Sequence, residues 1–527
     1  MKVQKSITLL FLSLTLFTSS KIAAANSNSK PRIIITADPE LDDNNSLIRF
    51  LLYSAEFNIE GLVYASSQFH WKGDGKGTKF MVPGREYTKY GLNLCPCESY
   101  RWNKDERFIH DAVEAYEKVY QNLVIHNRSY PSPSYLKSKI KYGNIEFEGD
   151  FSKDTEGSNL IKKIILDTLA GPVYITAWGG QSTIARALKS IEDEFKKSKN
   201  WNFIKQKISK KVVLLPSGDQ DNTYASYIKP NWPDIDYRQY KNGPNYGYGA
   251  QLSANAENAP LLTAEWMQKN ISLTGALGDI YRVWGDGKQT VKDDRFDYFG
   301  LDGYTNEQLK QMGYIVWMPK QPKGSWLGEG DTGTFMNLLN NGLNAIEKDN
   351  PGGWGGRAFN PNPKTFVDPF SNDTSKVKEL VISASTYNKM SEVDENEAAF
   401  PDFFSAAQND FAARMNWSVK NNYKLANHAP VIRLKNKTDL TVKPGQMINL
   451  EAIVNDPDGD TYSIKWWQFF KQKNSAQIGI SNNNSSFTTI EIPKDATAQQ
   501  KIYLVLEVAD KTAISITSYK MIKITVN

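Results

Sequence analysis

From residue 32 onward, short apolar runs alternate along the chain with amphipathic stretches. Arg32–Thr36 is an apolar run of strand length, Asn45–Glu56 gathers apolar side chains near one helical face, and Asn58–Ala65 is a second strand-like run. Strand, helix and strand in this rhythm predict parallel pairing and an α/β fold, with ligands at the carboxyl ends of the strands. The alternation continues with helices predicted at Arg107–His126 and Thr183–Phe195 and strands at Val173–Trp178 and Lys211–Leu215.

The pattern changes near residues 427–430. Beyond them, short alternating runs are separated by Gly, Pro and Asn or Asp turns, and no segment has helical periodicity. About 100 residues of this kind predict an immunoglobulin-like β-sandwich, with Trp466 and Trp467 supplying core from a central strand. We therefore expect an α/β domain over 30–425, mainly a parallel sheet flanked by helices, and a small all-β domain over 429–527. The strands are predicted at Val431–Leu434, Met447–Val454, Ser463–Phe470, Ile502–Val508 and Tyr519–Val526.

The first 25 residues have the composition of a signal peptide. Lys2 and Lys5 precede an apolar run too short to span a bilayer, and an alanine-rich stretch ends at Ala25. We expect cleavage near Ala25, a secreted or periplasmic protein, and no membrane insertion after cleavage. Removing the three lysines of this segment from the formal charge of +5 leaves +2. A chain so close to neutral gives no electrostatic case for a nucleic-acid partner.

The chain has only two cysteines, Cys95 and Cys97, separated by one proline. Two thiolates make an incomplete zinc site, since four ligands are usual. We expect either a local disulfide or a pair of structural thiols, and a fold held by its core rather than by a disulfide framework.

Three aspartates follow the first predicted strand: Asp38, Asp42 and Asp43. Carboxylates this close repel one another unless a cation or protons intervene, and oxygen-only ligands favour a hard cation such as Ca²⁺. The alternative is that Asp42 and Asp43 cap a helix beginning near Asn44. The position of the cluster at the end of a parallel strand favours the metal site.

The segment TADPELDD at 36–43 resembles the D-x-D-P-x-x-D-D signature of nucleoside hydrolases, with Thr36 in place of the first aspartate. The resemblance implies that Asp38 binds calcium and acts as base towards the attacking water. It also implies that Asp43 binds calcium and that Asp42 holds sugar hydroxyls. In the same way, residues 174–185 resemble the family's strand, G-P-L-T-N turn and helix, which makes Ser182 the equivalent of a backbone metal ligand.

The last metal ligand of that family is an Asp preceded by a His acid, and the segment GEGDTGT at 328–334 is the equivalent here. The resemblance assigns Asp331 to the metal and leaves Glu329 as the candidate acid, because no His stands in the family's position. A His acid would have to be His70, His110 or His126, and His70 is the best placed of these to contact the substrate, since it follows the second strand. A structural role for a lone histidine is the alternative.

The whole chain resembles an exported cellulose-binding-protein family that carries a nucleoside-hydrolase-like domain, followed usually by an immunoglobulin-like tail. The resemblance spans about residues 30 to 425, and it rests on the segments DDNNSLIRFLLYS, AWGG, SGDQD, GGWGGR and QNDFAAR.

Other candidates depend on position alone. Asp219 and Asp221 follow a predicted strand and are candidates to bind sugar hydroxyls, with an ordinary loop as the alternative. Trp354 is a candidate to stack on a sugar and Arg357 to hold a hydroxyl or carboxylate, against a packed glycine-rich loop. The segment DPDGD at 456–460 predicts either a turn or a second Ca²⁺ site.

The resemblance implies a calcium-dependent hydrolase that acts on N- or O-glycosyl bonds of an extracytoplasmic glycoside or glycan, by metal-activated water with Asp38 as base. The alternatives are a non-catalytic carbohydrate-binding protein on the same scaffold, or an adhesin built on the sandwich. The expected partner is a carbohydrate or glycoside, and an oligomer remains open.

Overall fold

The computed structural model describes residues 30–88, 92–359 and 396–527. Pro31–Asn527 forms one compact unit. The predicted signal peptide, 1–25, lies outside the described residues. Within them, no helix is both long and apolar enough to cross a membrane.

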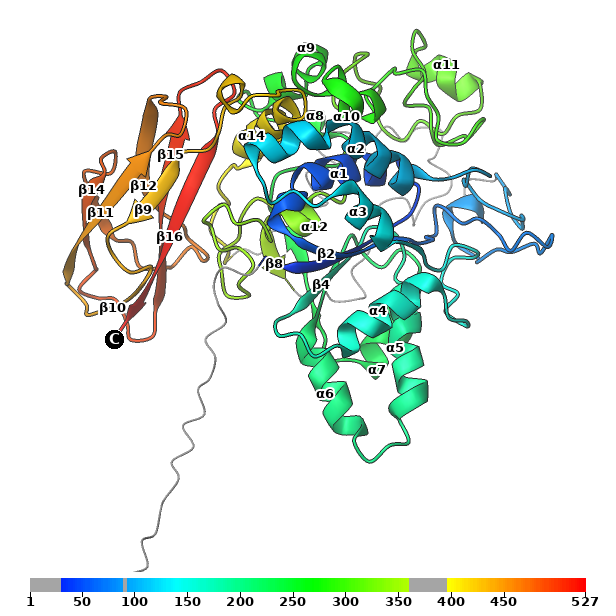
Figure 1. The fold of residues 1–527 in the computed structure, drawn as a ribbon, viewed down its shortest axis with the longest axis horizontal. Helices are drawn as coiled ribbons and strands as arrows, with labels where there is room; N and C mark the ends of the chain where they lie inside the picture. Colours follow the sequence, from blue (N-terminus) through cyan, green and yellow to red (C-terminus); the bar gives the residue numbers. More distant parts are fainter. Residues whose placement is uncertain (1–29, 89–91, 360–395) are drawn as a thin grey trace, which may run out of the picture. The chain divides into compact units, whose positions relative to one another are not determined.

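The centre of the α/β part is a six-stranded parallel sheet in the order β3-β2-β1-β4-β5-β6 (Figure 1). The first strand, β1, pairs with β2 on one side and with β4 on the other, both in parallel. This arrangement confirms the predicted α/β fold. The strands are β1 (Arg32–Ala37), β2 (Asn58–Tyr64), β3 (Ile140–Tyr142), β4 (Val173–Ala177), β5 (Val212–Pro216) and β6 (Asp236–Tyr237).

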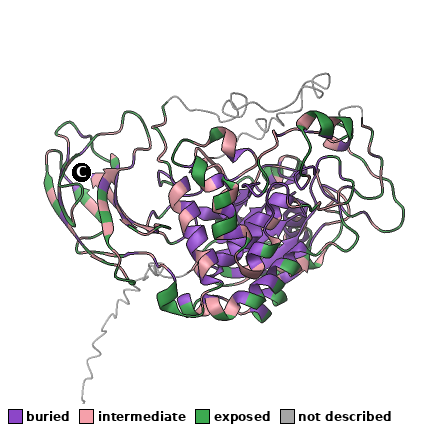
Figure 2. Ribbon diagram, turned by 90° about the horizontal axis from the view of Figure 1, so that it is seen from above, coloured by how far each residue is buried: buried purple, intermediate pink, exposed green. Residues whose placement is uncertain are grey.

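Helices cover both faces of the sheet, and the side chains of β1 show why its sequence is apolar throughout. Ile33 and Ile35 belong to one buried cluster, together with side chains of α1 and α2, whereas Ile34 belongs to a second cluster with side chains of α4 and α5. A strand buried on both faces is a continuous apolar run rather than an alternating one. The buried residues are purple in Figure 2. The main helices are α1 (Leu41–Leu52), α2 (Phe108–His126), α3 (Pro133–Lys139), α4 (Glu156–Leu166), α5 (Ser182–Phe195), α6 (Trp201–Lys211) and α14 (Phe404–Trp417).

Helix α1 begins at Leu41, earlier than the predicted start at Asn45, and ends at Leu52 rather than Glu56. The helical apolar pattern does not mark a polar first turn, which is where Asp42 and Asp43 lie. Acidic side chains in a first turn favour the positive end of the helix dipole.

Short elements connect the sheet to α14. They are α7 (Lys229–Asn231), β7 (Gln239–Lys241), α8 (Ala250–Ser253), α9 (Ala264–Met267), α10 (Gly275–Ile280), α11 (Asn306–Gln311), α12 (Gly333–Met336) and β8 (Arg357–Phe359). The loop between β2 and α2 carries a disulfide between Cys95 and Cys97, which is one of the two predicted alternatives.

The C-terminal part consists of two four-stranded sheets, β10-β16-β15-β12 and β13-β14-β11-β9, as predicted for a sandwich. All pairs are antiparallel except β10 with β16. Trp466 is buried, but its strand β12 lies at the edge of its sheet and not in the centre. The division into domains at 425–429 stays a prediction. The strands are β9 (Val431–Leu434), β10 (Asp439–Val442), β11 (Met447–Asn455), β12 (Tyr462–Gln468), β13 (Gly479–Ser481), β14 (Phe487–Glu491), β15 (Lys501–Asp510) and β16 (Thr517–Val526).

Candidate metal centre

Asp38 lies directly after β1 and is completely buried. Its Oδ2 accepts a hydrogen bond from the Ser67 hydroxyl at 2.5 Å and lies 3.0 Å from His70 Nδ1. Its Oδ1 has no hydrogen-bond partner, although it too is buried. A buried, unpaired carboxylate oxygen is costly unless a cation or a ligand satisfies it.

Two further aspartates of the loop lie beside Asp38. Asp43 Oδ1 accepts a hydrogen bond from the Asp38 backbone N–H at 3.1 Å. Asp42 accepts from the Tyr248 hydroxyl at 3.3 Å and from the Gly330 N–H at 3.2 Å. These contacts connect the first turn of α1 to a loop almost three hundred residues later in the chain.

Asp331 comes from that later loop, just before α12. The Ser217 hydroxyl donates to its Oδ1 at 2.6 Å, and its backbone N–H donates to Ser46 Oγ at 3.3 Å. Burial and the charges of Asp42 and Asp38 raise the pKa of Asp331 well above its ordinary value, although its hydrogen bonds with Ser217 and Asp43 act the other way. The structure thus brings together the four aspartates that the resemblance singled out.

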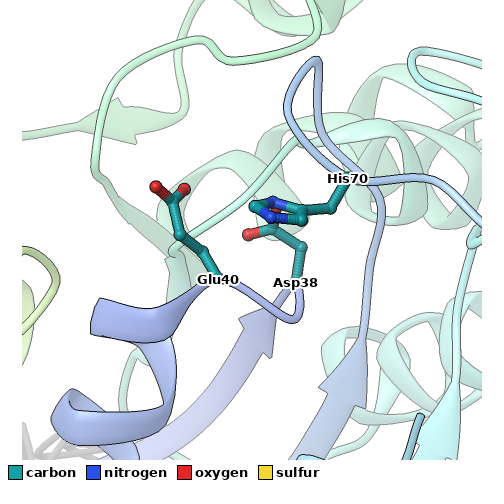
Figure 3. Close-up of side chains that lie close together, drawn as sticks. All are labelled: Asp38, Glu40 and His70. Carbon is teal, nitrogen blue, oxygen red and sulfur yellow. The ribbon is translucent and has the colours of Figure 1, made fainter. Parts of the chain in front are cut away.

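Glu40 is a fifth carboxylate of this cluster, and the sequence analysis gave it no role because the signature treats its position as variable. Its carboxylate lies within 4.8 Å of ligand atoms of Asp38 and His70, and also of Asp42 and Asp43. Figure 3 shows Asp38 at the end of β1, Glu40 at the start of α1 and His70 from the next loop, gathered at one place. An acidic residue two positions after Asp38 in the same tight loop was the signal that could have identified it.

The electrostatics of the cluster favour a counter-charge. Burial and then the charge of Asp38 raise the pKa of Asp42 to about 6. Burial and neighbouring carboxylates also raise the pKa values of Glu40 and Asp43 well above their ordinary values. Ionised carboxyl groups held this close repel one another, so some of them retain their protons unless a cation compensates the charge.

Two glycines allow the backbone to approach these carboxylates. A Cβ added to Gly179 would lie 2.7 Å from Asp38 Oδ1, and one added to Gly330 would collide with Asp42 Oδ2. Both positions therefore need glycine because a side chain would occupy the space next to the carboxylate oxygens.

His70 is buried against Asp38, as its place after β2 suggested. Burial lowers the pKa of His70 and the charge of Arg101 lowers it further, while the hydrogen bond to Asp38 opposes both. Arg101 was not predicted. It lies in the loop before α2, and its Nε donates to Asp294 at 2.6 Å.

Ser182, Asp219 and Asp221 follow β4 and β5, and the two aspartates accept hydrogen bonds from backbone N–H groups, one of them that of Ser182. Ser182 is the first residue of α5, and its N–H donates to Asp221 Oδ2 at 2.8 Å. Asp219 accepts from the N–H groups of Tyr224 and Ala225 at 3.2 and 3.0 Å. These contacts are those of ordinary loop caps, so sugar binding by the two aspartates and metal binding by Ser182 remain predictions.

Glu329 is completely buried in an ion pair with Arg49. Its two oxygens also accept hydrogen bonds from the Tyr281 hydroxyl at 2.5 Å and the Thr332 hydroxyl at 2.9 Å. With both oxygens engaged, the carboxylate is held as an acceptor. This arrangement gives the predicted acid role no support and indicates a structural role.

Trp354 and Arg357 lie in a packed loop, which was the alternative considered for them. Trp354 is buried, with its ring against that of Tyr519. Arg357 is also buried, and it donates to the backbone carbonyls of Pro351, Ala398 and Phe470. The structure places neither side chain against the aspartates.

The DPDGD segment of the sandwich also gathers three carboxylates. Ligand atoms of Asp456, Asp458 and Asp460 lie within 4.8 Å of one another. Asp456 Oδ1 accepts from the N–H groups of the other two at 2.9 and 3.1 Å, which is the hydrogen bonding of a turn. Both predicted alternatives stay open.

Glu148 is a buried carboxyl beside the aspartate Asp221. Burial raises its pKa to about 7 from the ordinary 4.5, despite the opposing ion pair with Arg85. The folded protein therefore holds this proton more tightly than the unfolded chain does. The stabilisation from that proton is complete below pH 4.5 and is lost as the pH rises through about 7.

We expect Glu148→Gln to remove much of this pH dependence. The free energy of unfolding of the wild type should fall between pH 5 and pH 8 by about 1–3 kcal/mol more than that of the variant. Urea unfolding at both pH values measures the difference, with exposed Glu307→Gln as the control. An equal change in wild type and Glu148→Gln would contradict the prediction.

Comparisons with known proteins agree with this fold. A family model described as "Cellulose-binding Sde182, nucleoside hydrolase-like domain" matches residues 32–358. A second, described as "Cellulose-binding protein Sde0182, C-terminal domain", matches residues 447–526. No curated protein matches the sequence.

Among solved structures, a nucleoside hydrolase-related hypothetical protein from Saccharophagus degradans, described as associated with carbohydrate metabolism, is similar over 95% of this chain and 100% of its own. The identity is 22% and the TM-score 0.65, which shows a shared fold. Domains 4 and 5 of the S-layer protein SbsC match 18% of this chain and 53% of their own, at 17% identity. The TM-score of 0.14 is too low to indicate a shared fold.

Proposed function

The chain belongs to the cellulose-binding Sde182 family with a nucleoside hydrolase-like domain, as its motifs predicted, and on that premise we propose that its aspartate cluster binds Ca²⁺ and hydrolyses a glycosyl bond of an extracytoplasmic carbohydrate or glycoside. The observation that carries the proposal is Asp38 Oδ1, a buried oxygen without a hydrogen-bond partner beside the carboxyl groups of Glu40, Asp42 and Asp43.

The residues present fit a hard cation. Asp38, Asp43 and Asp331 would hold it, with Glu40 as a further oxygen ligand, because their donor atoms are carboxylate oxygens. When bound, Ca²⁺ supplies positive charge that offsets these carboxylates and acidifies a water molecule. The close approach of Gly179 leaves the space beside Asp38 Oδ1 free of side chains, which supports the same use of this oxygen.

Side chains of the protein carry out proton transfer, orient the base and bind the sugar. Asp38 takes the proton of the attacking water, and His70 and Ser67 fix the orientation of its carboxylate through Oδ2. Asp42 accepts hydrogen bonds from sugar hydroxyls. The surrounding carboxylates stabilise the positive charge that develops on the sugar ring in an oxocarbenium-like transition state.

Glu329 fixes the position of the loop that carries Asp331 and does not protonate the leaving group. It shares a short loop with Asp331, and its ion pair with Arg49 fixes that loop to the last turn of α1. The same α1 carries Asp42 and Asp43 in its first turn. The ion pair therefore fixes the position of Asp331 relative to Asp42 and Asp43.

A non-catalytic carbohydrate-binding protein is the second candidate, and one observation favours it. Gly330 stands before Asp331, where the nucleoside hydrolases have a His acid, and the nearby Glu329 is held in an ion pair. A site with ligands for a cation and for hydroxyl groups, whose remaining candidate acid, His70, is bound to Asp38, binds a sugar without cleaving it. Turnover of glycosides by the wild type separates the two candidates.

The proposal predicts that the purified mature protein contains about one Ca²⁺ and that Asp43→Ala loses it. Saturating calcium should stabilise the wild type by about 2.7 kcal/mol at a hundredfold excess over Kd. Elemental analysis and thermal unfolding with and without calcium measure both effects.

Exposed Asp105→Ala is the matched control and should keep the ion. A calcium ion that survives Asp43→Ala would lie elsewhere, as in the DPDGD segment. If the wild type and both variants are all free of calcium, the metal centre and the hydrolytic function are excluded together.

A further inference from the structure

A cavity of about 380 Å³ lies outside the aspartate cluster. Ligand pockets are typically about 300–1000 Å³, so this one has room for a small molecule. We propose that it is a binding site for a neutral saccharide. Its walls are Asn242, Gly243, Pro244, Asn245, Ala250, Ser253, Ala254, Asn255, Asn258, Leu262 and the run 400–404.

Asp402 fixes the orientation of two carboxamides in this cavity. Its Oδ2 accepts hydrogen bonds from Asn255 Nδ2 at 2.6 Å and from Asn258 Nδ2 at 2.7 Å, and its Oδ1 accepts from the Phe404 N–H at 2.9 Å. A carboxylate can only accept, so each amide must turn its nitrogen towards Asp402 and its oxygen away from it. Three N–H donors also satisfy the charge of Asp402 without a cation.

The amide oxygens of the two asparagines then differ. Asn255 Oδ1 accepts from the N–H groups of Glu257 and Asn258 at 3.0 and 2.9 Å. Asn258 Oδ1 has no hydrogen-bond partner, although the residue is only 7% exposed. A buried acceptor in a fixed orientation calls for a donor, and the cavity it lines is the place from which a ligand hydroxyl can supply one.

The rest of the wall selects the class of ligand. Among the residues that the structure describes, the lining has no Lys, Arg or His, so none of these side chains attracts an anion. Carboxamides and the Ser253 hydroxyl both donate and accept hydrogen bonds, as sugar hydroxyls require. Phe400 and Pro401, which are both partly exposed, offer apolar surface to the C–H groups of a sugar ring. A polyhydroxylated ligand without charge matches all of these features.

The site is tested by isothermal titration of the full-length mature protein with cellotetraose. Ser253→Trp places a large ring at an exposed position of the cavity wall, and Asn258→Leu removes the unpaired acceptor at similar volume. We expect each variant to lower the affinity at least about tenfold, the effect of one lost hydrogen bond or contact. Ser134→Trp, at an exposed position of α3, should bind as the wild type does.

Comparison with the Asp43→Ala variant separates this site from the aspartate cluster. We expect Ser253→Trp to lose affinity for cellotetraose while it keeps the calcium content of the wild type, because the substitution lies outside the cluster. Binding that disappears in Asp43→Ala but survives in Ser253→Trp would place the sugar at the cluster alone and overturn the proposal. So would a wild type that binds no cellotetraose while it retains calcium, a result that would leave the metal centre intact. Thermal unfolding of Ser253→Trp shows that a loss of binding is not a loss of fold.

Discussion

Replacing Asp38 with asparagine is expected to lower the kcat for glycoside hydrolysis by about 10²–10⁴-fold, the usual contribution of a general base. Asparagine has the same size and keeps an oxygen for Ser67 and His70, but it cannot take a proton from water. It also removes negative charge beside Asp42, Asp43 and Glu40. Steady-state kinetics of wild type and variant on a panel of aryl glycosides and nucleosides measure the change.

The same two proteins distinguish the enzyme from the binder. Retained sugar binding with lost turnover in Asp38→Asn supports hydrolysis, and Asp105→Asn is the control for a charge change at an exposed position. Turnover at the wild-type rate in Asp38→Asn would remove Asp38 from the mechanism. A wild type without turnover on any glycoside would favour the non-catalytic carbohydrate-binding protein.

Breaking the Arg49–Glu329 ion pair is expected to destabilise the fold by about 3–5 kcal/mol, because Glu329→Leu leaves the guanidinium charge of Arg49 buried and unpaired. Both side chains are fully shielded from solvent. The rings around Arg49, with Phe411 at 3.9 Å from its Cζ to the ring centroid, provide no full charge to compensate. Chemical denaturation of the metal-free protein measures the free energy of unfolding without a contribution from calcium.

Two controls define the origin of that loss. The double variant Arg49→Met with Glu329→Leu should regain part of the stability, since burying two apolar side chains is less costly than burying one unpaired charge. Lys435→Met breaks an exposed pair with Glu451, and it should cost less than about 1 kcal/mol. A single Glu329→Leu variant as stable as the wild type would show that the pair does not hold the loop of Asp331.

The sequence predicts the sheet well because its signal is local. A strand that is buried on both faces, such as β1, is apolar throughout, and Asp38 follows it where any parallel sheet places its ligands. The start of α1 was placed too late because Asp42 and Asp43 are polar. In the sandwich, Trp466 was correctly assigned to the core, but neighbouring strands were not predictable from one strand, so the edge position of β12 was missed.

The parts of the site that the sequence could not give depend on contacts between distant segments. Nothing near Glu329 indicates that its partner is Arg49, and the cavity depends on Asn258 meeting Asp402. Glu40 differs, because it lies in the same loop as Asp38. It was given no role only because the family signature treats its position as variable. Trp354 shows the opposite error, since a tryptophan among glycines suggests an exposed platform but fills a gap in the core.

The distance along the chain between Asp38 and Asp331 has a consequence for the order of events during biogenesis. The first of the proposed ligands emerge early in synthesis, but the last one follows almost three hundred residues later. A nascent chain therefore carries several mutually repelling acids before Asp331 joins them, and under the proposed function the capture of a cation would belong to the final steps of folding. Because contacts so far apart close slowly, metal uptake would then mark the maturation of the whole α/β part and not of its first half.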